Sequence, residues 1–147
     1  MPTAKSRTRA VPSSRPSGPS EFSPGVFVGG WKEAVNFEGT RFCVLDDAPD
    51  DMPPATHIPI YNQARDRADP KRLNELAEAM AKARAKGQPV LVFCGHGVRR
   101  SPLGAAWYLH RIEGLPLDEA YARVAAVRPK IERATEWVGN ASELESA

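Results

Sequence analysis

Short apolar runs alternate with longer amphipathic segments along most of the chain. Four of the runs have the length of strands and are bounded by residues typical of turns, such as Gly, Pro and Asp. They span residues 25–28, 41–45, 56–60 and 89–93. The last run is apolar on both faces, which is typical of a strand in the middle of a covered sheet. Strands that alternate with helices predict a layered α/β domain.

Helical periodicity is clearest in three segments. Asp69 followed by Pro70 predicts a helix start, and that helix runs to Lys86 with Gly87 placed to end it. Its expected buried face is Leu73, Leu76, Ala77 and Met80. Residues 102–113 are nearly apolar all round, which indicates a central buried helix, and a third helix is expected over 117–127. Two short helices are expected over residues 31–36 and 134–138.

The ends of the chain differ from the middle in composition. Residues 1–20 contain four basic residues, no acid, and many Pro and Ser residues, so they offer little apolar surface to bury. We expect a disordered arm over residues 1–21, a folded domain over 22–140 and a flexible tail over 141–147. The formal net charge is only +2, and this balance gives no indication of a nucleic-acid partner.

The number of cysteines and the hydropathy pattern indicate the cellular compartment of the protein. Cys43 and Cys94 are the only cysteines of the chain, too few for a disulfide framework, although redox pairing between them stays open. No apolar run reaches the roughly 18 residues of a membrane span, and no secretory signal is evident. The scattered His and Cys residues do not predict a metal site. We therefore expect a cytoplasmic monomer without a cofactor or a membrane partner.

The segment Val90–Pro102, VLVFCGHGVRRSP, carries the candidate chemistry. Cys94 ends the apolar strand and Ser101 lies at the start of the buried helix. Gly95 and Gly97 permit a turn whose backbone N–H groups point at a common centre, and the N-terminus of the helix adds partial positive charge. Such a loop is suited to hold a tetrahedral oxyanion such as phosphate.

The residue types in this loop suggest nucleophilic catalysis. The same positive field favours the thiolate form of Cys94, which would lie beside a bound phosphoryl group as an in-line nucleophile. Arg100 can hold two oxygens with its planar fork, and Ser101 can hydrogen-bond the sulfur when it leaves. A lone buried cysteine is usually a packing residue, but the combination of Cys94 with Gly97, Arg100 and Ser101 favours the catalytic interpretation. The candidate phosphate-binding residues are Gly95, His96, Gly97, Val98, Arg99 and Arg100.

These residues resemble the signature of the cysteine-dependent protein tyrosine phosphatases, in particular the compact dual-specificity class. That signature is Cys, five residues, Arg and then Ser or Thr, with Gly three positions after the Cys; the matching residues are Cys94, Gly97, Arg100 and Ser101. The run SPLGAAWYLHRIEGLPLDEAYARVAAVRP and the early GVFVGGW are also similar to the family. The resemblance covers about residues 22–138. It implies an α/β fold with a central, mostly parallel sheet of about four to five strands flanked by helices.

The resemblance also implies an activity. We expect metal-independent hydrolysis of a phosphomonoester, such as a phosphorylated protein, through a cysteinyl-phosphate intermediate. Two positions depart from the family pattern: Phe93 replaces the His that usually precedes the nucleophile, and Asn62 stands where the general-acid Asp is usually found. Asp66 is the stronger replacement acid, because Asp69 is explained as a helix cap.

Three alternatives stay open. A rhodanese-like sulfurtransferase would use an arginine one position earlier, where Arg99 stands. Low-molecular-weight tyrosine phosphatases and arsenate reductases contain a loop that Arg100-Ser101-Pro102 resembles, but they hold it near their N-terminus, whereas Cys94 lies past the middle of this chain. A pseudophosphatase would bind phosphate with weak turnover, which the presence of Asn62 would explain. The sequence leaves the substrate open among phosphotyrosine, phosphoserine or phosphothreonine, lipid and nucleotide phosphates.

Overall fold

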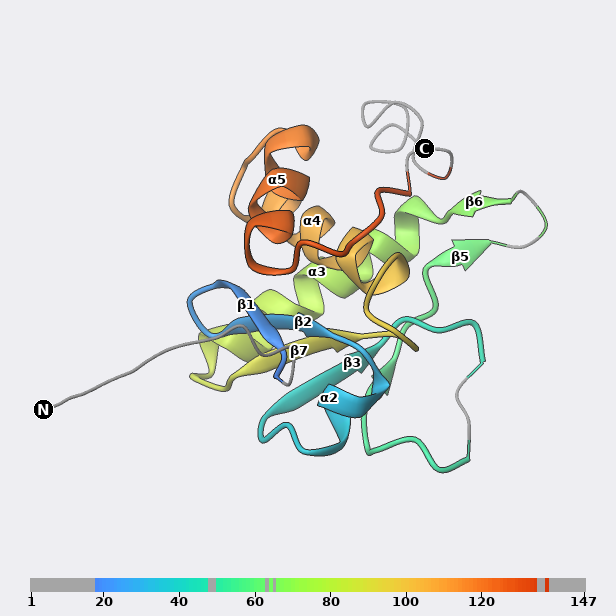
Figure 1. Ribbon diagram of the computed structural model, residues 1–147, viewed down its shortest axis with the longest axis vertical. Helices are drawn as coiled ribbons and strands as arrows, with labels where there is room; N and C mark the ends of the chain where they lie inside the picture. Colours follow the sequence, from blue (N-terminus) through green and yellow to red (C-terminus); the bar gives the residue numbers. More distant parts are fainter. Residues whose placement is uncertain (1–17, 48–49, 63, 65, 135–136, 138–147) are drawn as a thin grey trace, which may run out of the picture.

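The computed structural model describes residues 18–47, 50–62, 64, 66–134 and 137. Its main sheet has five strands in the order β1-β2-β7-β3-β4 (Figure 1). The strands are β1 (Ser20–Ser23), β2 (Val26–Gly29), β7 (Val90–Phe93), β3 (Thr40–Cys43) and β4 (Thr56–His57). β1 pairs antiparallel with β2, and every other pairing is parallel. The expected central, mostly parallel sheet of about four to five strands is confirmed.

Helices cover both faces of this sheet. One face carries α3 (Pro70–Ala85), α4 (Arg100–Ile112) and α5 (Leu117–Val127), and the short α2 (Trp31–Val35) lies on the other face (Figure 1). Helix α4 is buried from Ser101 to Leu109, as its all-round apolar sequence predicts. The Asp69 side chain accepts a hydrogen bond from the Lys71 amide at 3.0 Å, which confirms the predicted cap of α3.

The sheet separates two buried clusters. The larger one packs the apolar faces of α3, α4 and α5 onto the sheet and includes Cys94. The smaller one lies under α2 and includes Cys43 and Phe93. Central strand β7 contributes to both clusters, because successive side chains of a strand point to opposite faces. The middle of the sheet is therefore anchored from both sides, and the loop that follows β7 starts from a fixed point.

Several boundaries differ from the sequence expectations. The first strand begins at Ser20, two residues before the expected onset of order. Strand β4 ends at His57 rather than residue 60. The chain then forms a second, two-stranded sheet, β5 (Tyr61–Asn62) with β6 (Arg67–Ala68), which hydropathy did not predict because each strand has only two residues.

The expected helix over 134–138 falls mostly outside the described residues, as do most of the expected arm and the expected tail. Within the described part of the chain, no helix has the length and apolar character needed to cross a membrane.

Candidate active site

The loop that joins β7 to α4 lies at the carboxyl edge of the sheet, and together with Arg100, the first residue of α4, it is called here the 94–100 loop. Cys94 is 5% exposed, at the floor of this loop. The neighbouring chain segment after β2 fixes the start of the loop: the Cys94 amide donates to Gly29 O at 3.4 Å, and the Trp31 amide donates to Gly95 O at 2.9 Å. These two hydrogen bonds hold the start of the loop against the last residue of β2 and the first residue of α2.

Polar hydrogens converge on the sulfur of Cys94. The amides of Gly97 and Ser101 lie 3.3 and 3.4 Å from Sγ, and the Ser101 hydroxyl oxygen lies 3.2 Å from it. The same hydroxyl donates to Gly29 O at 2.9 Å, so a protonated Cys94 would donate its S–H to Ser101 Oγ. One backbone N–H group of the loop and one of the first helical turn therefore point at this sulfur, an arrangement that favours negative charge on it.

Gly97 has a positive φ of 71°, a conformation that favours glycine. A Cβ atom at this position would lie 2.7 Å from Gly29 C and 2.5 Å from Arg128 Nη2. The position therefore requires glycine for two independent reasons, backbone conformation and space. The turn that glycine makes possible here directs the Gly97 amide at the Cys94 sulfur.

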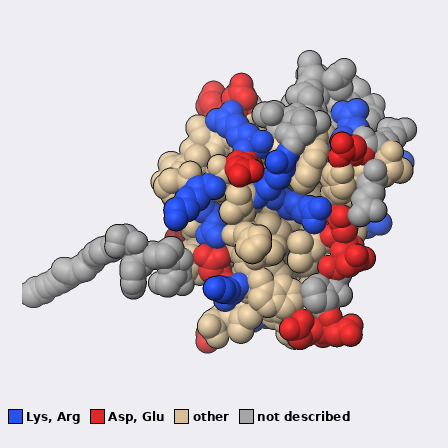
Figure 2. Space-filling view, turned by 45° about the vertical axis from the view of Figure 1, so that its right-hand side comes forward, with Lys and Arg blue, Asp and Glu red and all other residues tan. Residues whose placement is uncertain are grey.

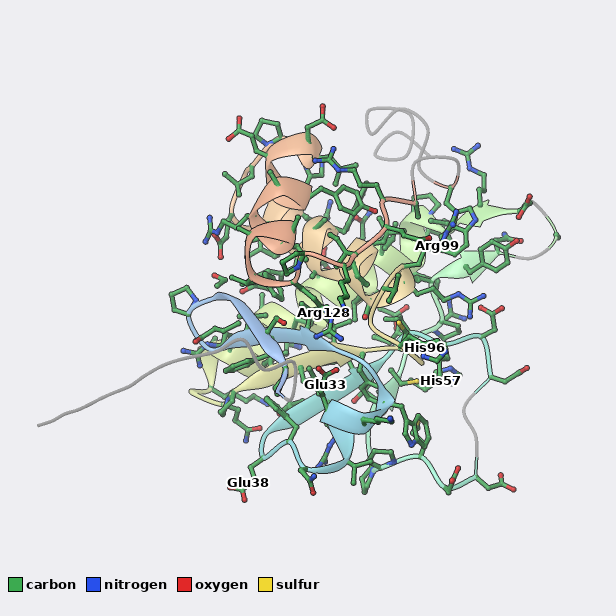
Figure 3. The ribbon with its side chains drawn as sticks, in the orientation of Figure 1. Glu33, Glu38, His57, His96, Arg99 and Arg128 are labelled. Atoms are coloured by element: carbon green, nitrogen blue, oxygen red, sulfur yellow. The ribbon has the colours of Figure 1, made fainter. Side chains whose placement is uncertain are left out.

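Arg128, at the end of α5, holds the outer side of the 94–100 loop. Its Nε donates to Gly97 O at 2.8 Å, and its Nη2 donates to His96 O at 3.3 Å. The guanidinium also forms a two-point ion pair with Glu33 of α2, at 3.0 and 3.1 Å (Figure 3). Since these carbonyl oxygens are bound from outside, the loop amides are free to face inward. Sequence reasoning placed Arg128 only within the family-like "RP" sequence and gave no signal for Glu33.

The Arg100 guanidinium lies between a carboxylate and two aromatic rings. Its Nη2 is 3.4 Å from Asp46 Oδ2, and its Cζ is 5.4 Å from the Tyr61 ring centre and 5.8 Å from that of Trp137. Asp46 was not expected at the site, and Trp137 is half-buried and also packs against the larger core cluster. The guanidinium of Arg99 lies over the same Trp137 ring, with its Cζ 4.6 Å from the ring centre.

The two candidate acid positions lie in the β5–β6 hairpin. Asn62 pairs with Arg67 in the two-stranded sheet. Asp66 is exposed, adopts a positive φ of 53° and accepts a hydrogen bond from the Tyr61 hydroxyl. That bond is the main cause that raises the pKa of Tyr61. Tyr61 thus contacts both Asp66 and Arg100, so the hairpin lies beside the candidate site. Which of residues 62 and 66 occupies the general-acid position stays a prediction.

The remaining sequence candidates occupy different surroundings. His96 and Val98 lie in the loop with their backbone carbonyls bound from outside, Val98 O by the Glu132 amide at 2.7 Å, and the His96 side chain is exposed. Cys43 faces the cluster under α2, whereas Cys94 faces the opposite cluster. Burial raises the pKa of the Cys43 thiol, which keeps it protonated.

Charge is unevenly spread on the face turned forward in Figure 2. Lys and Arg side chains gather across its upper and central part with some Asp and Glu side chains among them, and further Asp and Glu side chains lie along its right-hand and lower margins. Among the described residues, no group of three or more His, Cys, Asp or Glu side chains could hold a metal ion.

Comparisons with known proteins place these features in a family. The family model for the dual specificity phosphatase catalytic domain matches residues 48–147. No curated protein matches the chain.

Several solved structures share the fold. A mouse protein assigned as a dual specificity phosphatase, in complex with zinc tungstate, has a TM-score of 0.74 at 23% identity, and the match covers 93% of this chain and 92% of that one. A single-residue variant of human DUSP28 gives a TM-score of 0.71 at 21% identity, with 89% and 96% covered. The human tyrosine phosphatase-like serine/threonine/tyrosine-interacting protein gives 0.70 at 18%, with 88% and 97% covered.

Proposed function

This chain belongs to the dual specificity phosphatase family, and we propose that it hydrolyses phosphomonoesters through a cysteinyl-phosphate intermediate. The observation that carries this proposal is the position of Cys94 Sγ, within 3.4 Å of two backbone amides, Gly97 in the loop and Ser101 in the first turn of α4. A buried packing cysteine has no need of such donors. Here they stabilise the thiolate that attacks the phosphorus atom.

The proposed reaction has two steps. The Cys94 thiolate attacks phosphorus in line, the S–P bond forms, and the ester P–O bond breaks as the leaving oxygen takes a proton from Asp66 or from water. Arg100 and the amides of residues 95–100 hold the equatorial oxygens during this transfer. A water molecule then attacks phosphorus, and its proton passes to the carboxylate that served as acid or stays on the phosphate. The S–P bond breaks with its electron pair on sulfur, and the Ser101 hydroxyl turns from Gly29 O to donate to the departing thiolate. The products are the alcohol or phenol and inorganic phosphate.

The same proposal extends to partners. A phosphorylated protein or another phosphomonoester would be the substrate, bound without metal or cofactor by the loop residues Gly95, His96, Gly97, Val98, Arg99 and Arg100. The cytoplasmic compartment, the monomeric state and the domain limits of 22–140 stay predictions.

A panel of aryl, peptide, lipid and nucleotide phosphates tests the activity, run on the unaltered chain beside Cys94→Ser. We expect turnover in the first and none in the second, with phosphate binding retained because the amides and Arg100 remain. Arg100→Lys should also be severely impaired, since a point charge cannot reproduce the bidentate fork. Turnover that survives Cys94→Ser would remove the covalent mechanism.

A phosphate-binding pseudophosphatase is the second candidate, and Asn62 at the usual acid position favours it. It predicts phosphate binding with only weak turnover, and a turnover assay with an activated aryl phosphate separates it from the enzyme. A thiosulfate sulfurtransferase assay tests the rhodanese-like alternative, in which Arg99 rather than Arg100 would be required.

A further inference from the structure

We propose that Asp46 is a positioning residue that orients Arg100 for the phosphoryl group, an inference that rests on the proposed phosphatase function. The Oδ2 atom of Asp46 lies 3.4 Å from Nη2 of Arg100, and the two side chains are 21% and 28% exposed. The residues are 54 positions apart in the chain, so the contact exists only in the folded molecule.

Asp46 lies three residues after the end of β3, on backbone that is tied to neighbouring segments. Strand β3 pairs in parallel with β7, and Cys43 lies opposite Phe93, so the chain after Cys43 runs beside the 94–100 loop. The Val44 amide donates to Phe93 O at 3.1 Å. A ring nitrogen of His57, Nε2, lies 2.6 Å from Leu45 O. The backbone is therefore held immediately before Asp46, which is what a residue needs if it is to orient another side chain.

The contact leaves Arg100 able to bind phosphate. One carboxylate oxygen meets one terminal nitrogen of the guanidinium, whose five N–H donors include more than that contact uses. The Tyr61 ring, 5.4 Å from Cζ, limits the guanidinium from another direction. A long side chain that is oriented before binding loses less conformational freedom when the ligand arrives.

This role depends on an acceptor oxygen rather than on the charge of Asp46. A carboxylate beside the site repels a phosphate dianion, so its charge by itself weakens binding. An asparagine keeps an oxygen that accepts from Arg100 and removes the charge. Asp46→Asn should therefore preserve phosphate affinity or improve it, whereas Asp46→Ala should weaken it.

The test measures the dissociation constant of inorganic phosphate by calorimetry on the full chain carrying Cys94→Ser. We expect Asp46→Ala to weaken binding roughly 3- to 10-fold, the cost of ordering one long side chain. Asp46→Asn should bind at least as well as the parent. Asp47→Ala is the matched control, because Asp47 is the next residue, carries the same charge and is exposed; it should stay within about 2-fold of the parent.

A double-mutant cycle shows whether Asp46 affects phosphate binding through Arg100. In an Arg100→Ala background, Asp46→Ala should cause no further loss, because the residue through which Asp46 acts is absent. Asp46→Ser gives a second truncation, with a hydroxyl too short to reach the guanidinium, in case the alanine variant is unstable in a thermal scan.

Each outcome is decisive. If the Cys94→Ser parent binds no phosphate, the proposed function itself has failed. If the parent binds phosphate and Asp46→Ala equals Asp47→Ala, only the positioning role is wrong. Tighter binding by Asp46→Ala would show that Asp46 competes with phosphate for Arg100 instead of orienting it, and it would overturn the inference.

Discussion

Glu33 and Arg128, 95 residues apart in the chain, form a two-point ion pair behind the 94–100 loop. Their side chains are 11% and 17% exposed. Glu33 also accepts from the Gly30 amide at 2.6 Å, and Arg128 donates to two loop carbonyls. The pair therefore joins α2, the loop and the end of α5, and it sets the direction in which the loop amides point.

Arg128→Lys should lower the catalytic efficiency kcat/KM roughly 10- to 100-fold without contacting substrate, because a small displacement of the loop misplaces the amides and Cys94. A lysine has one ammonium group and cannot bind Glu33, Gly97 O and His96 O together. Kinetics with an activated aryl phosphate measure the effect. Arg123→Lys is the matched control on the same helix, since Arg123 pairs with Glu113 instead. Equal activity of the two variants would contradict a role for Arg128 in shaping the loop.

Gly97→Ala should damage both stability and activity. Gly87 offers a matched control, because its φ is also positive, at 86°, but nothing lies within 4 Å of a Cβ built there. Gly87→Ala should lower the free energy of unfolding by about 1–2 kcal/mol through backbone strain and keep full activity. Gly97→Ala should lose roughly 1–3 kcal/mol more from the contacts with Gly29 and Arg128, together with most of its turnover. Urea unfolding and kcat give the comparison, and similar values for the two variants would show that close packing at Gly97 is unimportant.

Asn62→Asp should raise activity on phosphotyrosine or phosphoserine if residue 62 occupies the general-acid position. Positioned acid catalysis contributes typically 10²–10⁴-fold, and it should add a new basic limb to the pH profile. Activated aryl phosphates, whose leaving group needs no proton, serve as the control substrate and should change little. The reverse pattern, a large loss in Asp66→Asn and no gain in Asn62→Asp, would assign the acid to Asp66.

Stability should decline in alkaline solution partly through Tyr121. This residue is 2% exposed, and burial raises its pKa from 10.0 to about 12. Below pH 10 the phenol is neutral in both states, and between about pH 10 and 12 only the unfolded chain ionises readily, so unfolding is favoured as pH rises. A two-unit shift corresponds to about 3 kcal/mol at most.

Denaturant unfolding at pH 9, the reference, and near pH 12 measures this decline in the free energy of unfolding. The Tyr121→Phe variant, measured at the same two pH values, is the comparison. The unaltered chain should lose more stability than Tyr121→Phe over that interval. Equal losses would mean that Tyr121 does not titrate differently in the two states.

Features that depend on neighbouring residues can be predicted from the sequence. The Asp69 cap, the apolar strand at residues 90–93 and the fully buried helix that follows can each be recognised locally, because turn chemistry and hydrophobic period act over a few positions. The spacing of Cys94, Gly97, Arg100 and Ser101 is also local, since one loop carries all four. For these reasons the fold class was predicted correctly, whereas the candidate site residues and their roles stay predictions.

Which distant residues surround that loop depends on the folded arrangement of the strands and helices. The sheet order β2-β7-β3 places the segment with Glu33 on one side of Cys94 and the segment with Asp46 on the other. Neither carboxylate carries a local pattern that differs from an ordinary surface acid. The same holds for Trp137, whose place against Tyr61, with ring centres 4.8 Å apart, depends on how the end of the chain returns to the β5–β6 hairpin. Contacts of this kind follow from strand order and helix packing, which no short stretch of sequence encodes.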